Sequence, residues 1–347
     1  MKNNSQILDL SAAPIIIAEV AQAHDGSLGM AHAYIDAASE AGADAIKFQT
    51  HIADAESTLD EPFRVKFSLQ DETRYDYWKR MEFTTEQWIG LANHAREKGL
   101  YFLSSPFSVE AVDLLEIVGV AGWKIGSGEA FSINLLNAIF STNKPILLST
   151  GMSNWEEIDT TVSILKSRNL DFVILQCTSK YPTPLDEVGL NVVEQIRSRY
   201  DVPAGLSDHS GTPWPAIIAL ARGASAIEVH VTFDRHMFGP DTKASVTFKE
   251  LSMICAARDA MRKIDKSPVD KDLTAIEMRT MRDTFGKSLA LRYPMTVGET
   301  ITRDSLTTKK PATGISYEDI NKVVGKKLNH DVSPDRLLRW DDLEEKN

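Results

Sequence analysis

The chain has 347 residues, of which 43% are hydrophobic and 25% are charged, and its formal net charge is −11. This composition is that of a globular protein with room for one large and one small domain. The negative charge argues against nucleic acid as the main partner, and no apolar run reaches the ~20 residues that a membrane span needs.

The N-terminus and the cysteines bear on the compartment. The first residues, MKNNSQILDLSAAP, lack the basic and apolar regions of a signal peptide. Two cysteines, Cys177 and Cys255, are too few for a disulfide framework and lie in apolar segments, so we expect reduced core thiols. Together these features predict a cytoplasmic protein.

Eight continuous apolar segments alternate with amphipathic stretches along the chain. Continuous apolar runs are typical of parallel strands that are covered on both faces. The expected strands are Ile15–Val20, Ala45–Phe48, Tyr101–Ser105, Trp123–Gly126, Pro145–Ser149, Phe172–Cys177, Ala204–Ser207 and Ala226–Val231. Eight strands, each followed by a helix through about residue 265, predict a (β/α)8 TIM barrel of the α/β class. A doubly wound open sheet is the alternative, but the first turn, EVAQAHDGSLG, lacks its glycine spacing.

Two of the expected helices carry a capping-box pattern at their start. Thr84 is followed three residues later by Gln87, and Ser153 by Glu156. By contrast, the stretch from about residue 50 to 82 is too long for a plain connection, and loops of this length tend to be functional or to carry local structure.

The character of the chain changes after residue 265. Residues 266–285 are charged and predict a linker with a short helix, whereas residues 286–347 show short alternating runs broken by Pro and Gly. The latter predict a small β-rich domain whose core is marginal, so we expect it to lean on another surface. The expected organisation is therefore a barrel at 1–265, a linker at 266–285 and a small domain at 286–347.

Polar side chains stand at the carboxyl end of every expected strand, where barrels of this kind carry their chemistry. In chain order they are Glu19, His24, Lys47, Gln49, Ser104, Ser105, Lys124, Ser127, Glu129, Ser149, Thr150, Gln176, Thr178, Ser179, Tyr181, Ser207, Asp208, His209, Glu228 and His230.

Two of these side chains, Lys47 and Lys124, are lysines at buried positions, where lysine is rare without a partner. We interpret them as a site for a phosphate or a carboxylate, assisted by the hydroxyls of Ser127, Ser149 and Ser207. The alternative is a pair of structural ion pairs.

The expected seventh and eighth strands each end in a histidine, His209 and His230. Neighbouring strands lie ~4.8 Å apart, so both imidazoles can reach one ion. Two imidazoles completed by carboxylate or water suit Mn, Fe, Co or Zn better than Mg. The alternative is two core histidines hydrogen-bonded to the backbone. Glu228 and Asp208 fit second partners of a metal site or ion-paired structural groups equally well.

Two further polar residues stay open on spacing alone. His24 follows the first strand and fits a metal ligand, a substrate contact or an exposed side chain. Asp241, in the turn FGPDTKAS, fits either an N-cap of the next helix or a clamp on substrate hydroxyls.

Eight motifs in a fixed order carry a resemblance to a known family. They are GADAIKFQTH, FLSSPFSVEAVDLL, WKIGSGE, LLSTGMS, LQCTSKYPTP, GLSDHS, EVHVTFDRHMFGPDTKAS and TVGETITRDSLTTKKPATGIS. Over roughly residues 14–345 the chain resembles the bacterial N-acetylneuraminate (sialic acid) synthases. The resemblance implies a barrel joined to an antifreeze-like (SAF) domain, which caps the partner's active site in a domain-swapped homodimer.

The same resemblance implies a reaction and a cofactor. The enzyme would condense phosphoenolpyruvate with N-acetylmannosamine or a related acylamino-hexose, and it would release phosphate by C–O cleavage. It would require a divalent metal, manganese in the first place, with magnesium and cobalt as alternatives.

Matching the motifs residue by residue assigns roles to named side chains. The catalytic groups would be Glu19, Lys47 and Lys124. The groups that hold phosphoenolpyruvate would be Lys47, Lys124, Ser127, Ser149, Ser179 and Ser207. The sugar contacts would be Glu129, Tyr181, Asp241 and Lys310, and the metal ligands His209 and His230.

Several positions depart from the family pattern, among them Asp25, Ala312 and the following three. Ala23 and Ser179 stand where asparagine is common, and Lys310 stands where an arginine reaches the sugar's acyl group. The last change makes precursors of legionaminic or pseudaminic acid alternative substrates.

Three functions of a different kind compete with this interpretation. A Schiff-base aldolase would use Lys47 or Lys124 as its nucleophile. A non-catalytic carbohydrate-binding module would use the barrel and the small domain for recognition alone. A related synthase would act on phosphorylated sugars, which the antifreeze-like tail disfavours.

Overall fold

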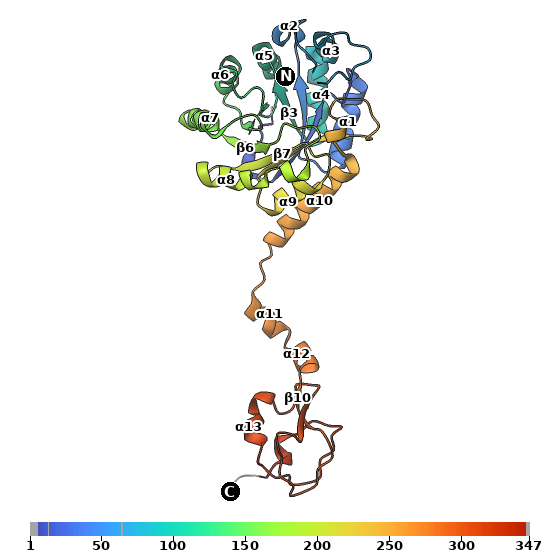
Figure 1. Ribbon diagram of the computed structural model, residues 1–347, viewed down its shortest axis with the longest axis vertical. Helices are drawn as coiled ribbons and strands as arrows, with labels where there is room; N and C mark the ends of the chain where they lie inside the picture. The colour runs from blue at the N-terminus through green and yellow to red at the C-terminus, as the bar shows by residue number, and fades with distance from the viewer. Residues whose placement is uncertain (1–5, 13, 64, 345–347) are drawn as a thin grey trace. The chain divides into compact units, whose positions relative to one another are not determined.

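A computed structural model describes residues 6–12, 14–63 and 65–344 of the chain. The chain divides into two compact units, Met1–Asp265 and Lys266–Asn347 (Figure 1). Each unit is described by itself.

The first unit is a closed barrel of parallel strands that follow one another in chain order. Within the described residues the barrel strands are β1 (Ile15–Ala21), β2 (Ala45–Thr50), β3 (Tyr101–Pro106), β4 (Trp123–Ile125), β5 (Ile146–Ser149), β6 (Phe172–Cys177), β7 (Ala204–Asp208) and β8 (Ala226–Thr232). The barrel closes because β8 pairs in parallel with β1, with His230 opposite Glu19. A short strand β9 (Val246–Thr247) adds to the end of β8. The predicted (β/α)8 barrel is confirmed, and each predicted strand ends within a residue or two of its predicted position.

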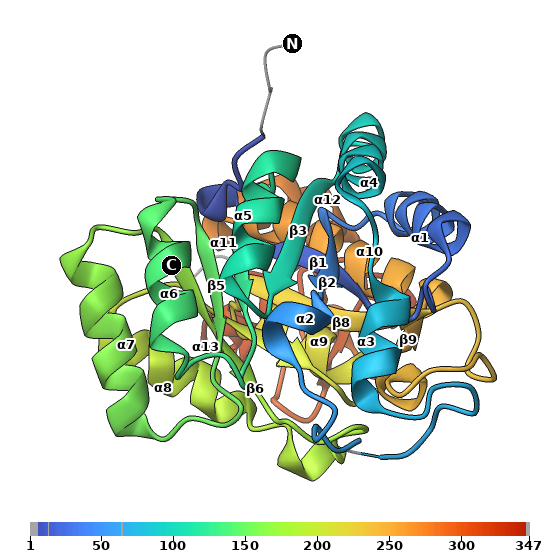
Figure 2. The same ribbon diagram turned by 90° about the horizontal axis from the view of Figure 1, so that it is seen from above.

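Helices surround the strands (Figure 2). They are α1 (Leu28–Glu40), α4 (Thr85–Glu97), α5 (Val109–Val118), α6 (Ile133–Ser141), α7 (Trp155–Ser167), α8 (Leu190–Tyr200), α9 (Trp214–Ala221) and α10 (Phe248–Asp265). The connection from β2 to α4, residues 51–84, carries two further helices, α2 (Ala53–Glu56) and α3 (Arg74–Met81). The expectation of local structure in this connection is therefore confirmed. Short 3-10 helices lie at Leu10–Ala12, Leu185–Glu187, Thr242–Ala244, Tyr317–Asp319 and Trp340–Asp342.

The two predicted capping boxes have different outcomes. Thr84 caps α4, and its side chain accepts a hydrogen bond from the backbone of Gln87. The second box is wrong by one residue, because Asn154 and Glu157 form it in place of Ser153 and Glu156. Both pairs have the same spacing, and asparagine caps a helix at least as well as serine.

The interior of the barrel has an apolar floor beneath a polar layer. The floor is an inner cluster that includes Leu8, Ile15, Ile17, Ala45, Leu103, Ala121, Leu147, Val173, Leu175 and Ala226. Since alternate residues of a strand face the same side, the next inward position after Ile17 is Glu19, and the next after Ala45 is Lys47. The sequence thus seals the amino end of the barrel and places charged groups above the seal.

The second unit is less regular than the first. It has the helices α11 (Lys271–Glu277), α12 (Arg279–Phe285) and α13 (Ile320–Val323) and one antiparallel sheet of β10 (Ser288–Leu291) and β11 (Leu306–Lys309). Isolated bridges such as Met295 with Val332 join its loops over a core that includes Leu289, Ile301, Val323 and Leu338. The predicted β-rich character is thus present mainly as single bridges, and the segment 266–285 holds two helices where one was expected.

Two expectations from composition can be compared with the structure. Cys177 and Cys255 are both free and buried, as predicted. Among the helices of the described residues, none combines the length and the apolar character that crossing a membrane requires.

Candidate active site

Four charged side chains meet in the polar layer of the barrel. Lys47 Nζ lies 2.9 Å from Glu19 Oε2 and 3.6 Å from Glu228 Oε1. Lys124 Nζ lies 3.6 Å from the same oxygen of Glu228. All four side chains are at most 4% exposed. The two lysines predicted from different strands therefore converge, and they share one carboxylate.

Burial acts differently on the four groups because their partners differ. It raises the pKa of Glu19 to about 7, against the opposing effect of the Lys47 ammonium. Burial also lowers the pKa of Lys124, and the Glu228 carboxylate offsets only part of this effect. For Glu228 and Lys47 the charged partners outweigh burial, so the pKa of Glu228 is lowered and that of Lys47 is raised. Glu19 is therefore the member whose charge changes near neutral pH.

Hydroxyl groups line the same layer and leave part of their hydrogen-bonding capacity unused. Ser207 Oγ donates to Glu228 Oε1 at 3.2 Å, and Lys47 Nζ donates to Ser105 Oγ at 3.2 Å. Ser149 Oγ and Glu228 Oε2 are buried and have no hydrogen-bond partner within the described part of the chain. Buried polar groups without partners are uncommon, so the layer has the character of a binding site for a polar ligand.

The two predicted metal ligands face each other one step above this layer. His230 follows Glu228 by two residues on β8, so it points inward one level nearer the mouth. The ring centroids of His209 and His230 lie 5.1 Å apart, and the ring of Tyr181 stacks on His209 at 4.1 Å. The two histidines therefore come together as their positions on neighbouring strands predicted.

The hydrogen bonds of His209 suit it to bind a metal. Its Nδ1 lies 2.9 Å from the carbonyl oxygen of Thr178, so Nδ1–H is the donor, and in the neutral ring Nε2 carries the lone pair that a metal needs. Nε2 of His209 lies 3.0 Å from the hydroxyl oxygen of Tyr181. No group of three or more His, Cys, Asp or Glu residues suited to a metal occurs among the described residues. Further ligands of an ion at His209 and His230 would therefore be water or substrate oxygens.

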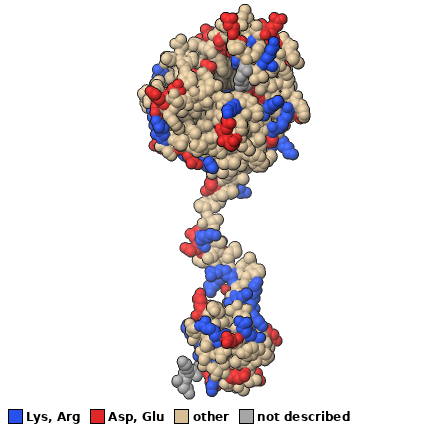
Figure 3. Space-filling model, viewed as in Figure 1, with Lys and Arg blue, Asp and Glu red and all other residues tan. Residues whose placement is uncertain are grey.

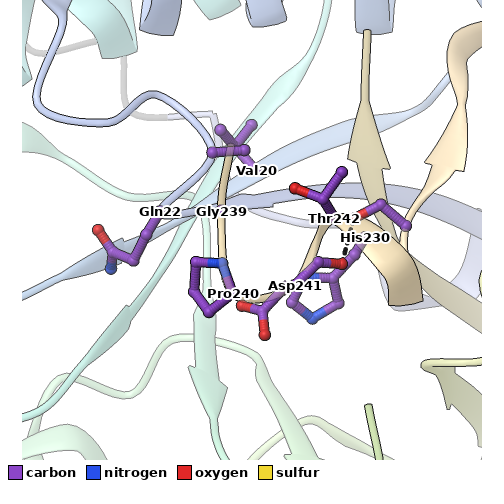
Figure 4. Close-up of a pocket in the computed structure, with 9 residues that line it drawn as sticks. Val20, Gln22, His230, Gly239, Pro240, Asp241 and Thr242 are labelled. Carbon is purple, nitrogen blue, oxygen red and sulfur yellow. Dashed lines mark hydrogen bonds between the residues drawn. The ribbon is translucent and has the colours of Figure 1, made fainter. Parts of the chain in front are cut away.

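A small pocket lies beside His230 at the mouth of the barrel (Figure 4). Its lining includes Gln22 from the end of β1 and the turn Gly239, Pro240 and Asp241, which follows β8. Asp241 occupies the N-cap position of the 3-10 helix that follows, as one interpretation expected, but its side chain makes no cap hydrogen bond there. Its carboxylate instead belongs to a pocket that contains a predicted metal ligand.

The remaining open positions have structural explanations. His24 is fully buried against the ring of Phe83 at 4.8 Å, so the prediction of an exposed side chain is wrong. Burial lowers the pKa of His24 to about 3, and its Nδ1 accepts a hydrogen bond from the backbone of Gly26 at 3.1 Å. The Asp208 carboxylate accepts hydrogen bonds from the backbone and the hydroxyl of Ser210, which closes the turn after β7. Glu228 is ion-paired with both lysines.

Comparison with known proteins places this site in a family. The model of the NeuB family matches residues 34–269, and the model of the SAF domain matches residues 286–344. This chain belongs to the NeuB family. An N,N'-diacetyllegionaminic acid synthase of Campylobacter jejuni is 34% identical to it over 94% of this chain and 98% of that protein. A pseudaminic acid synthase of the same species is 32% identical over 94% of this chain and 96% of that protein.

Further relatives of this NeuB protein are named for different products. The human N-acetylneuraminate-9-phosphate synthase is 32% identical over 93% of this chain and 90% of that protein. The solved N-acetylneuraminic acid synthetase of Leptospira borgpetersenii superposes with a TM-score of 0.68 and 31% identity, covering 81% of this chain and 95% of that one. These relatives share an architecture and differ in the sugar acid for which they are named.

The departure at Ser179 lies in a crowded part of the NeuB barrel. A Cβ atom added at Gly151 would lie 2.6 Å from Ser179 Oγ, 2.9 Å from Cys177 Sγ and 3.0 Å from Ser127 Oγ. Ser127 Oγ also accepts a hydrogen bond from the backbone of Gly151 at 3.0 Å. The loops after β4, β5 and β6 thus bring two predicted hydroxyls to one glycine, at which no side chain fits.

The remaining predicted sugar contacts lie in different surroundings. Glu129 is half-buried, and burial raises its pKa. Lys310 belongs to the second unit, where its Nζ lies 5.1 Å from the ring centroid of Phe285.

Sequence reasoning misses part of the environment of Glu19. Gln49 Nε2 donates to Glu19 Oε1 at 3.1 Å, so the two oxygens of this carboxylate have different partners. Gln49 stands at a strand end, but nothing in its spacing indicates this role. His51 and Glu56 complete the surroundings of Gln49 and carry no sequence signal of their own.

Proposed function

We propose that this protein is a phosphoenolpyruvate-dependent nonulosonic acid synthase. It condenses phosphoenolpyruvate with an N-acylated amino-hexose, either N-acetylmannosamine or a di-acetamido-trideoxyhexose, and releases phosphate. The convergence of Lys47 and Lys124 on Glu228 carries the proposal, together with the buried Ser149 hydroxyl, which has no hydrogen-bond partner among the described residues. The names of its relatives support the reaction class and leave the sugar open.

The lysines would act by holding a multiply charged substrate. Their ammonium groups are ion-paired with the carboxyl groups of Glu19 and Glu228. The pKa of Glu19 is about 7, so a large fraction of this carboxyl group is ionised near neutral pH, and the ionised form is the one that can accept a proton. Lys47 and Lys124 would then neutralise the carboxylate and the phosphate, and such positioning of two reactants can supply ~7–11 kcal/mol of the barrier.

The proposed reaction forms one carbon–carbon bond and breaks one carbon–oxygen bond. The methylene carbon of phosphoenolpyruvate attacks the aldehyde carbon of the open-chain sugar, and the aldehyde oxygen takes up a proton. Water adds to the resulting cationic carbon and loses a proton. The bond from that carbon to the phosphate oxygen then breaks, and the proton of the added hydroxyl passes to the leaving phosphate, so the water oxygen remains as the oxygen of a keto group. The Glu19 carboxylate, held on both oxygens, orients the water and accepts its proton.

His209 and His230 would hold the divalent ion, for which manganese is our first choice and magnesium or cobalt the alternatives. When bound, such an ion polarises a carbonyl oxygen as a Lewis acid. Tyr181, stacked on His209, and Asp241 of the adjoining pocket would contact the sugar, together with Glu129.

We further propose a homodimer in which the second unit of one chain caps the barrel of its partner and brings Lys310 to the sugar. Large apolar side chains on α11 and α12 are more than half exposed, among them Ile276, Met281 and Phe285. Such a surface is expected to be covered by another one. Free thiols at Cys177 and Cys255 are in keeping with work in the reducing cytoplasm.

A substrate panel tests the proposed reaction. Phosphoenolpyruvate and manganese are combined with N-acetylmannosamine, its 6-phosphate and di-acetamido-trideoxyhexoses, and liberated phosphate is measured. The phosphorylated sugar belongs in the panel because the human relative, named for a phosphorylated product, matches over 90% of its length. Oxygen-18 in the bridging position should leave with phosphate. Label retained in the sugar product would contradict C–O cleavage, and no phosphate with any sugar would contradict the proposal.

One observation favours a second candidate, a Schiff-base aldolase. Burial lowers the pKa of Lys124, and a desolvated lysine is a better nucleophile towards carbonyl groups. Borohydride would trap a covalent adduct of such an enzyme with its substrate, and chelators would leave its activity unchanged. A synthase of the proposed kind gives the opposite result in both experiments.

A further inference from the structure

A buried histidine outside the proposed reaction machinery is held rigidly next to it. The ring of His51, directly after β2, is stacked between Trp78 at 3.8 Å and Phe107 at 4.2 Å, with interplanar angles of 13° and 14°. Its side chain is 3% exposed. Trp78 belongs to α3 of the connection between β2 and α4, whereas Phe107 follows β3. The imidazole therefore cannot turn without displacing both rings.

Both nitrogens of this ring have polar partners. Nδ1 is hydrogen-bonded to the Glu56 carboxyl group, which is contributed by α2 of the same connection. Nε2 lies 3.4 Å from Gln49 Oε1. The amide of Gln49 in turn donates from Nε2 to Glu19 Oε1 at 3.1 Å. A continuous row of hydrogen bonds thus runs from Glu56 through His51 and Gln49 to Glu19.

The direction of this row matters because an amide can be turned round. A glutamine side chain has a donor end and an acceptor end of nearly the same shape, so packing alone does not decide which end faces Glu19. With its oxygen towards Glu19, the amide would face a carboxylate with another acceptor. Gln22 also donates to Gln49 Oε1, at 3.4 Å, but it is an amide that can itself be reversed. His51 fixes the direction if its hydrogen is on Nε2.

The pair of His51 and Glu56 puts the hydrogen on that nitrogen. Burial lowers the pKa of His51 to about 3 and raises that of Glu56 to about 8, so both groups are neutral near pH 7. A neutral carboxylic acid donates to Nδ1, which leaves Nε2–H to donate to Gln49. With these protonation states every hydrogen bond of the row, from Glu56 through His51 and Gln49 to Glu19, has one donor and one acceptor.

We propose that His51 and Glu56 are positioning residues that act through Gln49 to hold the Glu19 carboxylate in its working orientation. The inference rests on the proposed function, in which Glu19 handles the proton of the attacking water. It also gives a reason for the long connection between β2 and α4, which supplies Glu56 and Trp78.

The first test does not depend on any substrate. In protein labelled with nitrogen-15 histidine, the ring nitrogens of His51 are identified by their loss in His51→Phe. We expect the neutral tautomer with hydrogen on Nε2 at pH 7. The opposite tautomer would point a lone pair at Gln49 and overturn the proposal, whatever reaction the enzyme catalyses.

The second test compares variants by their kinetics. His51→Phe keeps a stacked ring and loses the hydrogen bond, so kcat should fall by ~10- to 100-fold while KM for phosphoenolpyruvate stays within ~2-fold. Glu56→Gln retains a donor for Nδ1 of His51 and should keep kcat within ~3-fold of the wild type. Glu56→Leu has no such donor, so its kcat should fall about as far as that of His51→Phe. If Glu56→Gln and Glu56→Leu lose the same amount of kcat, the proposal that Glu56 acts as a hydrogen-bond donor to His51 is contradicted.

Phe107→Leu is the matched packing control, since it removes one stacking ring and leaves every polar group of the row in place. Its melting temperature should fall at least as far as that of His51→Phe, with kcat within ~3-fold of the wild type. If Phe107→Leu loses as much kcat as His51→Phe, the effect is packing and the proposal is overturned. A wild type that releases no phosphate with any sugar would sink the proposed function, whereas wild-type kcat in His51→Phe would sink this inference alone.

Discussion

The barrel and the C-terminal unit place their functional groups in different ways. In the barrel, Glu19, Lys47, Lys124 and Glu228 all come from strands whose hydrogen-bonded register fixes their level. In the C-terminal unit, Lys310 follows a short strand of a two-stranded sheet and leads into a loop. Groups on regular strands are held more precisely than groups on loops, so the proposed division, with the reaction in the barrel and sugar recognition by Lys310, matches the rigidity of each unit.

The two units also differ in charge. Residues 1–265 carry a formal net charge of −12, whereas residues 266–347, with 15 basic and 14 acidic residues, carry +1. Figure 3 shows Lys and Arg side chains gathered on the visible face of that unit next to α12. The barrel is thus acidic on the whole and keeps a pair of lysines buried, whereas the smaller unit has a balanced charge and exposes its cations.

The largest effect is expected from one of the two buried lysines. Lys124→Ala should lower kcat by on the order of 10³-fold, because it removes a buried charge that holds the reacting anion. Glu228 keeps Lys47 as a partner in this variant, so the protein should stay folded. The measurement is phosphate release together with the melting temperature. Lys98→Ala, at an exposed ion pair with Asp36, is the control and should keep full activity.

Removal of the metal should come next in size. Chelation with EDTA, or the substitution His209→Ala, should lower phosphate release by ~100-fold or more, and manganese should restore activity only to the chelated wild type. Full activity after exhaustive chelation would show that the two imidazoles have a structural role alone.

The pH dependence tests the charge on Glu19. The pKa of this carboxyl group is raised to about 7, so its ionised fraction falls as the pH drops through 7. If the ionised form accepts the proton of water, kcat/KM should fall about tenfold per pH unit below that point. The profile of Glu19→Gln should lack this limb and be low throughout. If kcat/KM of Glu19→Gln still falls below pH 7 as in the wild type, another group causes the fall and the prediction for Glu19 is wrong.

The smallest effect is expected in the C-terminal unit. Lys310→Ala should raise KM for the sugar by ~10-fold, since one charge-assisted hydrogen bond is lost, and leave KM for phosphoenolpyruvate unchanged. Lys310→Arg, which restores the side chain that is usual in the family, should shift preference among the sugars of the panel. A fall in kcat as large as that of Lys124→Ala would mean that the two units do not divide recognition from chemistry.

Much of the barrel could be predicted because local pattern and global fold agree in it. Continuous apolar runs such as Ile15–Val20 are characteristic of strands covered on both faces, and the count of eight is enough to specify closure. The smaller unit was harder, because single bridges such as Thr300 with Lys327 replace regular ladders there. The alternation of apolar and polar residues in this unit extends over too few residues to identify each strand from its two-residue period.

The site could be predicted where one residue type at a strand end carries the signal. Lys47, Lys124, His209 and His230 are unusual in buried strands, and the structure brings each of these pairs together. The row from Glu56 to Glu19 could not be predicted in the same way. Its meaning lies in the direction of hydrogen bonds between a histidine, an amide and a carboxylic acid, and that direction depends on burial, which spacing does not reveal.

The apolar floor of the barrel has a kinetic consequence. Because Leu8, Ile17 and Leu147 belong to the cluster that fills the amino end, only the carboxyl end is left as an entrance. On β8, Glu228, which is ion-paired with both lysines, lies two residues below His230, so a ligand held by the lysines as proposed would lie beneath a sugar bound at His230 and the Asp241 pocket. Phosphoenolpyruvate should therefore enter before the sugar, and the sugar acid should depart before phosphate. Product-inhibition patterns will distinguish this order from random binding.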